Sequence, residues 1–208
     1  MELIVITPPT DIKDEVASVK EMLESGLDRL HLRKENSDID AYRNYLHQIP
    51  AVFHTQVSIH EYPELLNEFP LIGFHCKAIV WKDEKKLKEV LSCSSSSTIS
   101  ASFHSWEEVM QAPYDFDYGF VSPVFDSISK SDYPANIDIT KLKATRQYLS
   151  SNQKNAPKIF ALGGIDAAKI AQLDHTGFDG VAILGIVWRS DNCLAAFETI
   201  HRQIKGLQ

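Results

Sequence analysis

FALGGID, residues 160–166, is an apolar run that ends in two adjacent glycines, and the aspartate after them stands where a helix is about to start. GVAILG, residues 180–185, repeats the arrangement further along the chain. A short apolar strand that runs into a glycine turn and then a helix is the repeating unit of an α/β fold with parallel strands. These two stretches therefore predict consecutive strand-to-helix units, and the same unit recurs towards the N terminus.

Eight strand candidates of this kind alternate with amphipathic, helix-like stretches along the chain. Several of the helix-like stretches open on a capping residue, as at Asp83 and Ser105. Because eight parallel strands close a barrel, we predict one α/β domain over residues 1–208, a (β/α)8 TIM barrel; an open doubly wound sheet is the competing architecture. The strand candidates are residues 3–7, 29–33, 55–60, 71–75, 98–103, 118–121, 158–162 and 179–184.

Composition narrows the class of protein. The 208 residues are 44% hydrophobic and 24% charged, which is typical of a globular chain, and the net charge of −7 disfavours a partner made of nucleic acid. The three cysteines show no CxxC spacing, so neither a disulfide framework nor a zinc site is predicted. We find neither a signal peptide nor a run of roughly 18 apolar residues, and we therefore expect a cytoplasmic protein with no membrane partner. Whether two copies of the chain form a homodimer is left open.

The two glycine turns are candidate phosphate sites. In a (β/α)8 barrel, phosphate is commonly bound by the loops after the seventh and eighth strands. Glycine has no Cβ, so backbone N–H groups can approach an anion closely, and a helix N-terminus adds a positive dipole end. We expect the N–H groups around Gly163, Gly164, Gly185 and Ile186 to bind one phosphate. The alternative, that these glycines only make tight turns, stays open.

A long polar segment with two prolines, residues 122–138, follows the sixth strand candidate. A long loop in a compact barrel is more often functional than idle. Ser127, Ser129 and Lys130 would offer two hydroxyl donors and a positive charge to a phosphate or pyrophosphate. An exposed polar loop without a ligand is the alternative.

The second strand candidate contributes a third group of polar residues. His31, Arg33 and Glu35 alternate, so they share one face of the strand, which in a barrel is the inward face. Burying a guanidinium is costly unless it meets an anion or a carboxylate, so Arg33 is expected either to face an anionic ligand or to pair with Glu35.

Two further histidines, His60 and His75, end the third and fourth strand candidates, and Glu61 follows the first of them. The catalytic groups of such barrels lie at these strand ends, so we expect the histidines to contribute to substrate binding or acid–base chemistry. Buried structural imidazoles are the alternative. Metal binding by histidines on separate strands has no spacing signature in the sequence.

These motifs resemble the thiamine phosphate synthase family, with its thiazole tautomerase branch. The resemblance covers nearly the whole chain, and the sixth and seventh strand segments are its most specific parts. The family is a (β/α)8 barrel that joins a hydroxymethylpyrimidine diphosphate to a thiazole phosphate, uses magnesium and releases pyrophosphate. The matching segments are LIVIT (3–7), HLRKE (31–35), GFH (73–75), SASFHS (100–105), DYGFVSPVFDSISK (117–130), PKIFALGGI (157–165) and GFDGVAILGIV (177–187).

The resemblance implies a role for each group of candidate residues, with small phosphorylated heterocycles as partners. The glycine turns would bind the thiazole phosphate, and the polar loop would face the pyrophosphate together with Arg33. The candidate catalytic residues are Arg33, Lys130, Ser102 and His31. The candidate substrate-binding residues are Gly163, Gly164, Gly185, Ile186, Ser127, Ser129, His60 and His75.

Departures from the family pattern concern the metal and the leaving group. The family has Gln-x-Arg-x-Lys on its second strand, and Glu35 stands in place of that lysine. The family has Asn-Asp where this chain has His60-Glu61, and Val80 stands where a second magnesium aspartate is expected, with Asp83 nearest. Magnesium prefers oxygen ligands, so Glu61 is the one ligand that we predict for Mg²⁺.

These departures leave two alternatives to a synthase. One is a non-catalytic or regulatory protein that binds thiazole phosphate. The other is a tautomerase or isomerase on the same barrel with histidine acid–base groups, although Pro123 stands where the tautomerase branch has its histidine.

Overall fold

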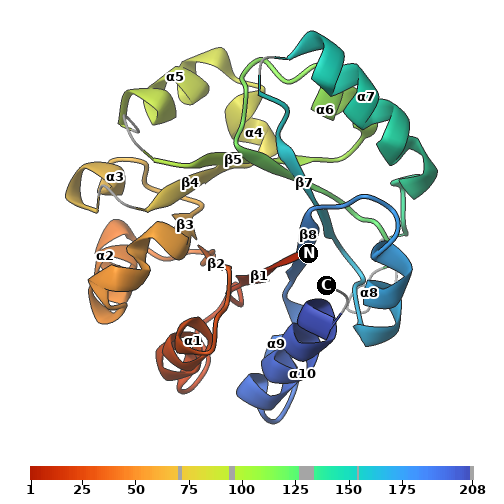
Figure 1. Ribbon diagram of the computed structural model, residues 1–208. Helices are drawn as coiled ribbons and strands as arrows, with labels where there is room; N and C mark the ends of the chain where they lie inside the picture. Colours follow the sequence, from red (N-terminus) through yellow and green to blue (C-terminus); the bar gives the residue numbers. More distant parts are fainter. Residues whose placement is uncertain (70–71, 94–96, 127–133, 154, 207–208) are drawn as a thin grey trace.

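The barrel is closed. The structure, a computed structural model, describes residues 1–69, 72–93, 97–126, 134–153 and 155–206. Within these residues all eight strands are parallel and pair in chain order, and β8 pairs back to β1 (Figure 1). The predicted (β/α)8 barrel is therefore confirmed. The strands are β1 (Glu2–Ile6), β2 (Arg29–Leu32), β3 (Val57–Ile59), β4 (Gly73–Cys76), β5 (Ile99–Phe103), β6 (Tyr118–Val121), β7 (Lys158–Leu162) and β8 (Gly180–Ile183).

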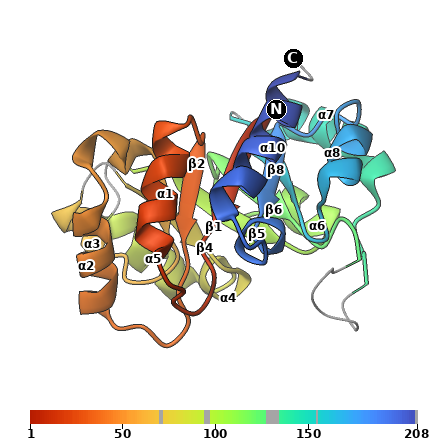
Figure 2. The same cartoon turned by 90° about the horizontal axis from the view of Figure 1, so that it is seen from below.

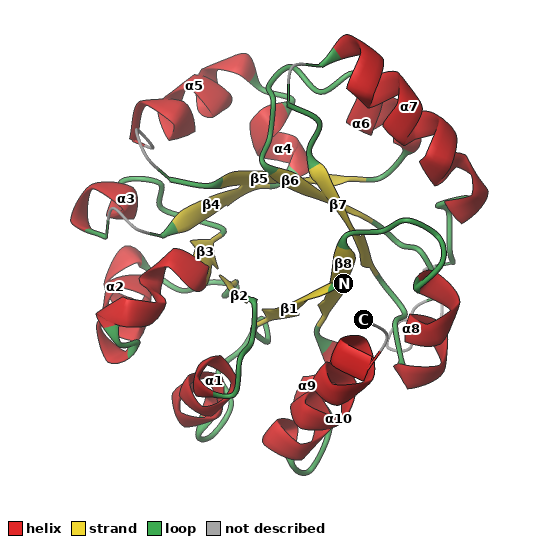
Figure 3. Cartoon of the chain, viewed as in Figure 1, coloured by secondary structure: helices red, strands yellow, loops and turns green. Residues whose placement is uncertain are grey.

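Helices surround the strands on the outside of the barrel (Figure 3). The predicted caps are present: the Ser105 hydroxyl accepts a hydrogen bond from Glu108 N, and Asp83 Oδ1 accepts from Lys85 N and Lys86 N. The side chain of Asp166 caps α8 in the same way by accepting from Lys169 N. The short helices α4 and α9 were not predicted. The helices are α1 (Glu15–Glu24), α2 (Ile39–Gln48), α3 (Leu65–Glu68), α4 (Ala78–Trp81), α5 (Glu84–Cys93), α6 (Trp106–Met110), α7 (Leu142–Asn152), α8 (Ala167–Leu173), α9 (Gly185–Trp188) and α10 (Cys193–Gly206), with 3-10 helices η1 (Ala51–Gln56) and η2 (Ile139–Lys141).

The third strand is shorter than the predicted range of 55–60. Thr55 and Gln56 belong to the 3-10 helix η1, and β3 begins at Val57. The N–H of Val57 donates to the carbonyl of His54, which closes a helical turn and takes that stretch out of the strand ladder. The polar segment 122–138 contains neither helix nor strand among its described residues, as predicted.

Helix α10 closes the ring by packing beside α1, so the last and the first units are neighbours (Figures 1 and 2). Apolar side chains on the outer face of the strands pack against the helices and form the larger core. None of the helices in the described ranges is long and apolar enough to cross a membrane.

The interior of the barrel divides into an apolar side and a polar side. Strands β1, β6, β7 and β8 supply a small apolar cluster that includes Ile4, Phe120 and Phe160. Strands β2 to β5 point polar side chains inward, and these are buried. Because a buried polar group is costly without a hydrogen-bond partner, the polar side has to be a connected network. The buried polar side chains of these strands are His31, Ser58, His75 and Ser100, with His60 directly after β3.

Candidate active site

Three histidines from neighbouring strands meet on the polar side of the barrel. His31 Nδ1 is 2.9 Å from His60 Nε2, and the ring centroids of His60 and His75 are 4.4 Å apart. The exposed fractions of the three side chains are 0%, 5% and 1% for His31, His60 and His75. The sequence predicted each as a site residue, and the structure brings them into one cluster.

Hydroxyl groups surround this histidine cluster. Tyr118 OH lies 2.7 Å from His31 Nε2 and 3.0 Å from Ser58 Oγ. His75 Nδ1 is 2.8 Å from Ser100 Oγ, and His75 Nε2 is 2.7 Å from Ser102 Oγ. One chain of hydrogen bonds therefore runs from the buried hydroxyl of Tyr118 through His31 to His60, and another runs from Ser100 through His75 to Ser102.

Burial holds all three histidines in the neutral form. Desolvation is the largest cause of the lowered pKa values, because the charged imidazolium loses its hydration inside the barrel. Neighbouring Lys77 and Arg33 add a smaller effect of the same sign and help to lower the pKa of His75 to about 3. Neutral imidazoles can accept protons or bind metals, and both uses depend on access from solvent.

That access comes from a cavity of about 250 Å³ at the mouth of the barrel, the mouth cavity. Two cations lie in its wall, and each is paired with a glutamate. Arg33 is 3.0 Å from Glu35 Oε1, which matches the ion-pair alternative for Arg33, and Lys77 contacts Glu61 Oε1. The wall is formed by Ile6, Arg33, His60, Lys77, Ala78, Ser102, His104, Phe120 and Leu162.

A second cavity, of about 410 Å³, lies over the two glycine turns, and we call it the glycine cavity. Gly163, Gly164, Gly185 and Ile186 all line it, so the four residues predicted for one phosphate share one wall. Leu162 lines both this cavity and the mouth cavity, so the two adjoin at the end of β7.

The glycines of this wall differ in what they do for the fold. Gly164 has φ +64°, and a Cβ there would lie 2.2 Å from the carbonyl oxygen of Asp126, so packing alone requires glycine. At Gly185, by contrast, the nearest atom to such a Cβ is Arg189 Cδ at 3.8 Å, an ordinary contact. Backbone conformation and packing therefore explain why position 164 is glycine. At Gly185 the surrounding contacts do not require glycine, and the residue lines the glycine cavity.

Backbone N–H groups from both glycine turns belong to the same wall. The N–H groups of Gly164, Gly185 and Ile186 have no protein acceptor within the described ranges of the chain. Orphan N–H groups at a strand-to-helix turn are the usual donors to a bound anion. One phosphate on this wall stays a prediction.

The predicted residues Ser127, Ser129 and Lys130 lie outside the described residues. Sequence reasoning missed Lys77 and Tyr118 as members of the site. The only signal for Lys77 was a cation directly after a strand end, and Tyr118 looked like an ordinary strand aromatic.

The described residues do not fit Mg²⁺. Glu61, the predicted ligand, has its carboxylate on Lys77, and Asp83 accepts hydrogen bonds from the N–H groups of Lys85 and Lys86 at the start of α5. Within the described ranges, the only group of three or more histidine, cysteine or acidic side chains placed to share an ion is the histidine cluster. Mg²⁺ prefers oxygen ligands, and these are nitrogens.

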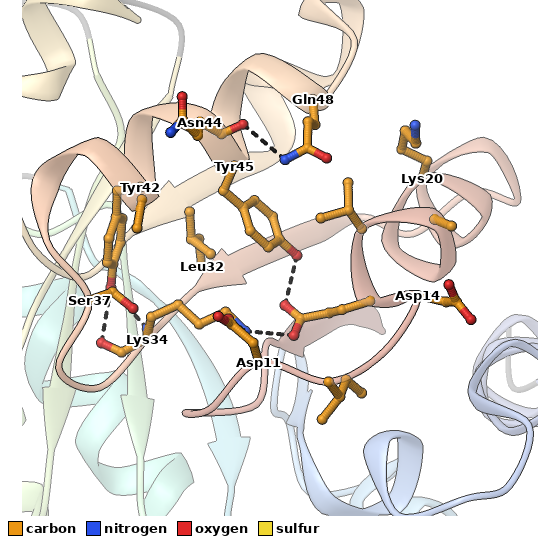
Figure 4. A pocket seen from close by; sticks show the side chains of 15 residues that line it. Asp11, Asp14, Lys20, Leu32, Lys34, Ser37, Tyr42, Asn44, Tyr45 and Gln48 are labelled. Carbon is orange, nitrogen blue, oxygen red and sulfur yellow. Dashed lines mark hydrogen bonds and ion pairs between the residues drawn. The ribbon is translucent and has the colours of Figure 1, made fainter.

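A further cavity, of about 510 Å³, lies outside the barrel between α1 and α2 (Figure 4). Lys34 and Tyr45 both reach the carboxylate of Glu15: Lys34 Nζ is 2.6 Å from Oε2, and the tyrosine hydroxyl donates to Oε1 at 2.9 Å. Asp11 adds a second carboxylate, 3.1 Å from Lys34 Nζ. Since these charged groups satisfy one another, this ion-pair cluster ties the end of β2 to the two helices.

Comparison with known proteins gives one consistent family. The profile described as thiamine monophosphate synthase matches residues 3–187. A thiamine-phosphate synthase of Desulfitobacterium hafniense (strain Y51) is 27% identical over 190 residues, which cover 88% of this chain and 87% of that protein. One of Chloroflexus aurantiacus is 34% identical over 110 residues, which cover 52% of this chain and 46% of that protein.

A solved structure agrees with these sequence matches. The crystal structure of thiamine phosphate pyrophosphorylase from Bacteroides thetaiotaomicron superposes with a TM-score of 0.72 at 30% sequence identity. The superposition covers 100% of this chain and 97% of that one.

Proposed function

Because the chain belongs to the thiamine monophosphate synthase family, we propose that it is a transferase that joins hydroxymethylpyrimidine diphosphate to thiazole phosphate and releases pyrophosphate. The observation that carries the proposal is the wall of the glycine cavity. There a side chain at Gly185 would make only ordinary contacts, and the neighbouring N–H groups have no protein acceptor in the part of the chain that the structure describes. A phosphate on these donors would anchor the thiazole.

The second substrate would occupy the mouth cavity, which adjoins the first at Leu162. This neighbourhood supports a reaction between two bound molecules, because positioning alone lowers the barrier of a two-substrate step. Arg33 and Ser102 line the mouth cavity and would contact the diphosphate. Ser127, Ser129 and Lys130, which lie outside the described residues, are proposed as further diphosphate contacts from the family resemblance alone.

The chemical step needs charge stabilisation more than proton transfer. The bond between the pyrimidine methylene and the diphosphate oxygen breaks, pyrophosphate leaves with the electron pair, and the thiazole nitrogen forms the new bond to the methylene carbon. Cations and hydroxyl donors aimed at the leaving oxygens lower the barrier because negative charge develops there. Arg33 and Lys130 supply the positive charge, and no step is assigned to Mg²⁺.

Two specific observations favour alternatives. Arg33 and Lys77 are each paired with a glutamate, which supports a protein that binds thiazole phosphate without catalysing transfer. The buried histidine cluster with an opening at His60 supports a tautomerase or isomerase that moves protons on a phosphorylated ring.

The deciding experiment supplies the purified protein with both precursors, with and without Mg²⁺, and measures thiamine phosphate and pyrophosphate. Product supports the synthase. Binding of thiazole phosphate without product supports the binding protein, and turnover of a single phosphorylated ring supports the isomerase.

A matched pair of lysine variants tests the leaving-group role. Lys130→Ala should depress turnover far more than it weakens thiazole phosphate binding, whereas Lys143→Ala on the exposed face of α7 should change neither. Equal loss of turnover and binding in Lys130→Ala would contradict the assigned role.

A further inference from the structure

We propose that His31, His60 and His75 form a binding site for a divalent transition-metal ion, with Zn²⁺ as its ion, just inside the mouth of the barrel. One ring nitrogen of each lies within 4.8 Å of the others, and all three side chains are buried. Three imidazoles with an open fourth position are a known ligand set for zinc. The proposal stands on this geometry and does not depend on the transferase reaction.

Binding of zinc requires the three rings to shift, because the present distances between their nitrogens differ from those of a zinc site. Zn–N bonds of about 2.1 Å place the nitrogens of a tetrahedral site about 3.4 Å apart. His31 Nδ1 and His60 Nε2 are 2.9 Å apart, so these two rings have to part slightly while His75 moves in. The ion would replace the proton that His31 and His60 share.

Outer hydrogen bonds already orient two of the rings. His31 Nε2 is held by Tyr118 OH at 2.7 Å, and His75 Nδ1 is held by Ser100 Oγ at 2.8 Å. Metal-binding histidines normally have their second nitrogen fixed in this way. The nitrogens left to face the ion are His31 Nδ1, His60 Nε2 and His75 Nε2, the last of which gives up its present contact with Ser102 Oγ.

Charge and access also allow the ion. The nearby cations Arg33 and Lys77 are each paired with a glutamate. Neither side chain therefore brings an uncompensated positive charge that would repel a divalent ion. His60 and Ser102 line the mouth cavity of about 250 Å³, which leaves room for a water molecule or a phosphate oxygen as fourth ligand. Nitrogen donors select Zn²⁺ over Mg²⁺.

The first test uses the unmodified protein. Protein stripped with EDTA is titrated with Zn²⁺ against a chromophoric chelator, and with Co²⁺ as a spectroscopic substitute. We expect one Zn²⁺ per chain, the intense visible bands of four-coordinate Co²⁺, and a higher melting temperature with Zn²⁺ but not with equal Mg²⁺. Absence of stoichiometric Zn²⁺ binding would overturn the proposal and leave a hydrogen-bonded histidine network.

The second test uses variants, each first compared with the parent by thermal unfolding in EDTA. His60→Ala should weaken Zn²⁺ binding by at least about 100-fold, and Tyr118→Phe by about 10-fold through the loss of its hydrogen bond to His31. His104→Ala is the matched control, because His104 lines the mouth cavity but lies outside the cluster. If His60→Ala does not fold, His75→Asn takes its place. Unchanged affinity in the cluster variant, or equal loss in His104→Ala, would refute the site.

Discussion

Gly185 offers the sharpest separation of the proposed phosphate binding from folding, because no side-chain clash among the described residues explains glycine at this position. Among the described residues, apart from its two chain neighbours and the backbone of its own helix, the nearest atom to a methyl group added at its Cα would be Arg189 Cδ at 3.8 Å, and Gly185 is the first residue of α9. A Gly→Ala change at a backbone position that alanine tolerates stabilises a protein by about 0.4–1 kcal/mol. We therefore expect Gly185→Ala to keep or slightly raise the melting temperature.

The same methyl group would stand in the glycine cavity, where a phosphate has to approach the N–H groups of Gly185 and Ile186. Losing one hydrogen bond to a charged group costs about 1.5–3 kcal/mol, and each 1.4 kcal/mol is a factor of ten. We expect thiazole phosphate to bind Gly185→Ala roughly 10- to 100-fold more weakly than the parent.

The assay is isothermal titration calorimetry with thiazole phosphate, and separately with inorganic phosphate, alongside thermal unfolding of each protein. Gly206→Ala, at the end of α10 with nothing within 4 Å of its added Cβ, is the matched control and should bind as the parent does. A folded Gly185→Ala protein with thiazole phosphate affinity within about threefold of the parent would refute the phosphate wall.

Three further predictions concern stability. Gly164→Ala should lower the free energy of unfolding by more than about 2 kcal/mol in urea titrations, because alanine is strained at φ +64° and its Cβ would lie 2.2 Å from Asp126 O; an unaffected midpoint would contradict this. Lys34→Met should lower the free energy of unfolding by about 3–5 kcal/mol, because the buried carboxylate of Glu15 is left uncompensated. Adding Glu15→Gln to this variant should restore much of the lost stability, and guanidinium unfolding of the single and double variants would check both expectations. In EDTA, the free energy of unfolding at pH 5.5 should be about 4 kcal/mol lower than at pH 7.5. Desolvation holds the pKa of each clustered histidine well below 6.5 in the folded protein, so only the unfolded chain takes up these three protons over this pH range. In His75→Gln, the free energy of unfolding should fall by about a third less between these two pH values. An equal fall in parent and variant would contradict the prediction, because His75 would then take up its proton in the folded protein.

The sequence by itself determined the barrel and its two glycine turns. The periodicity of apolar residues is local, so the alternation of strand and helix can be seen without coordinates, and so can the cap at Asp166. A positive φ at Gly163 and Gly164 follows from the same local argument, since the chain must turn sharply between β7 and α8.

Only the tertiary structure decided how the polar groups pair. His31, His60 and His75 come from three strands, and their contacts depend on strand register, which puts His31 level with Ser58 and His75 level with Ser100. Lys77, which follows β4, meets Glu61 beyond the end of the neighbouring β3 for the same reason. The sequence marks which side chains face inward, but the closure and stagger of the barrel decide which of them touch.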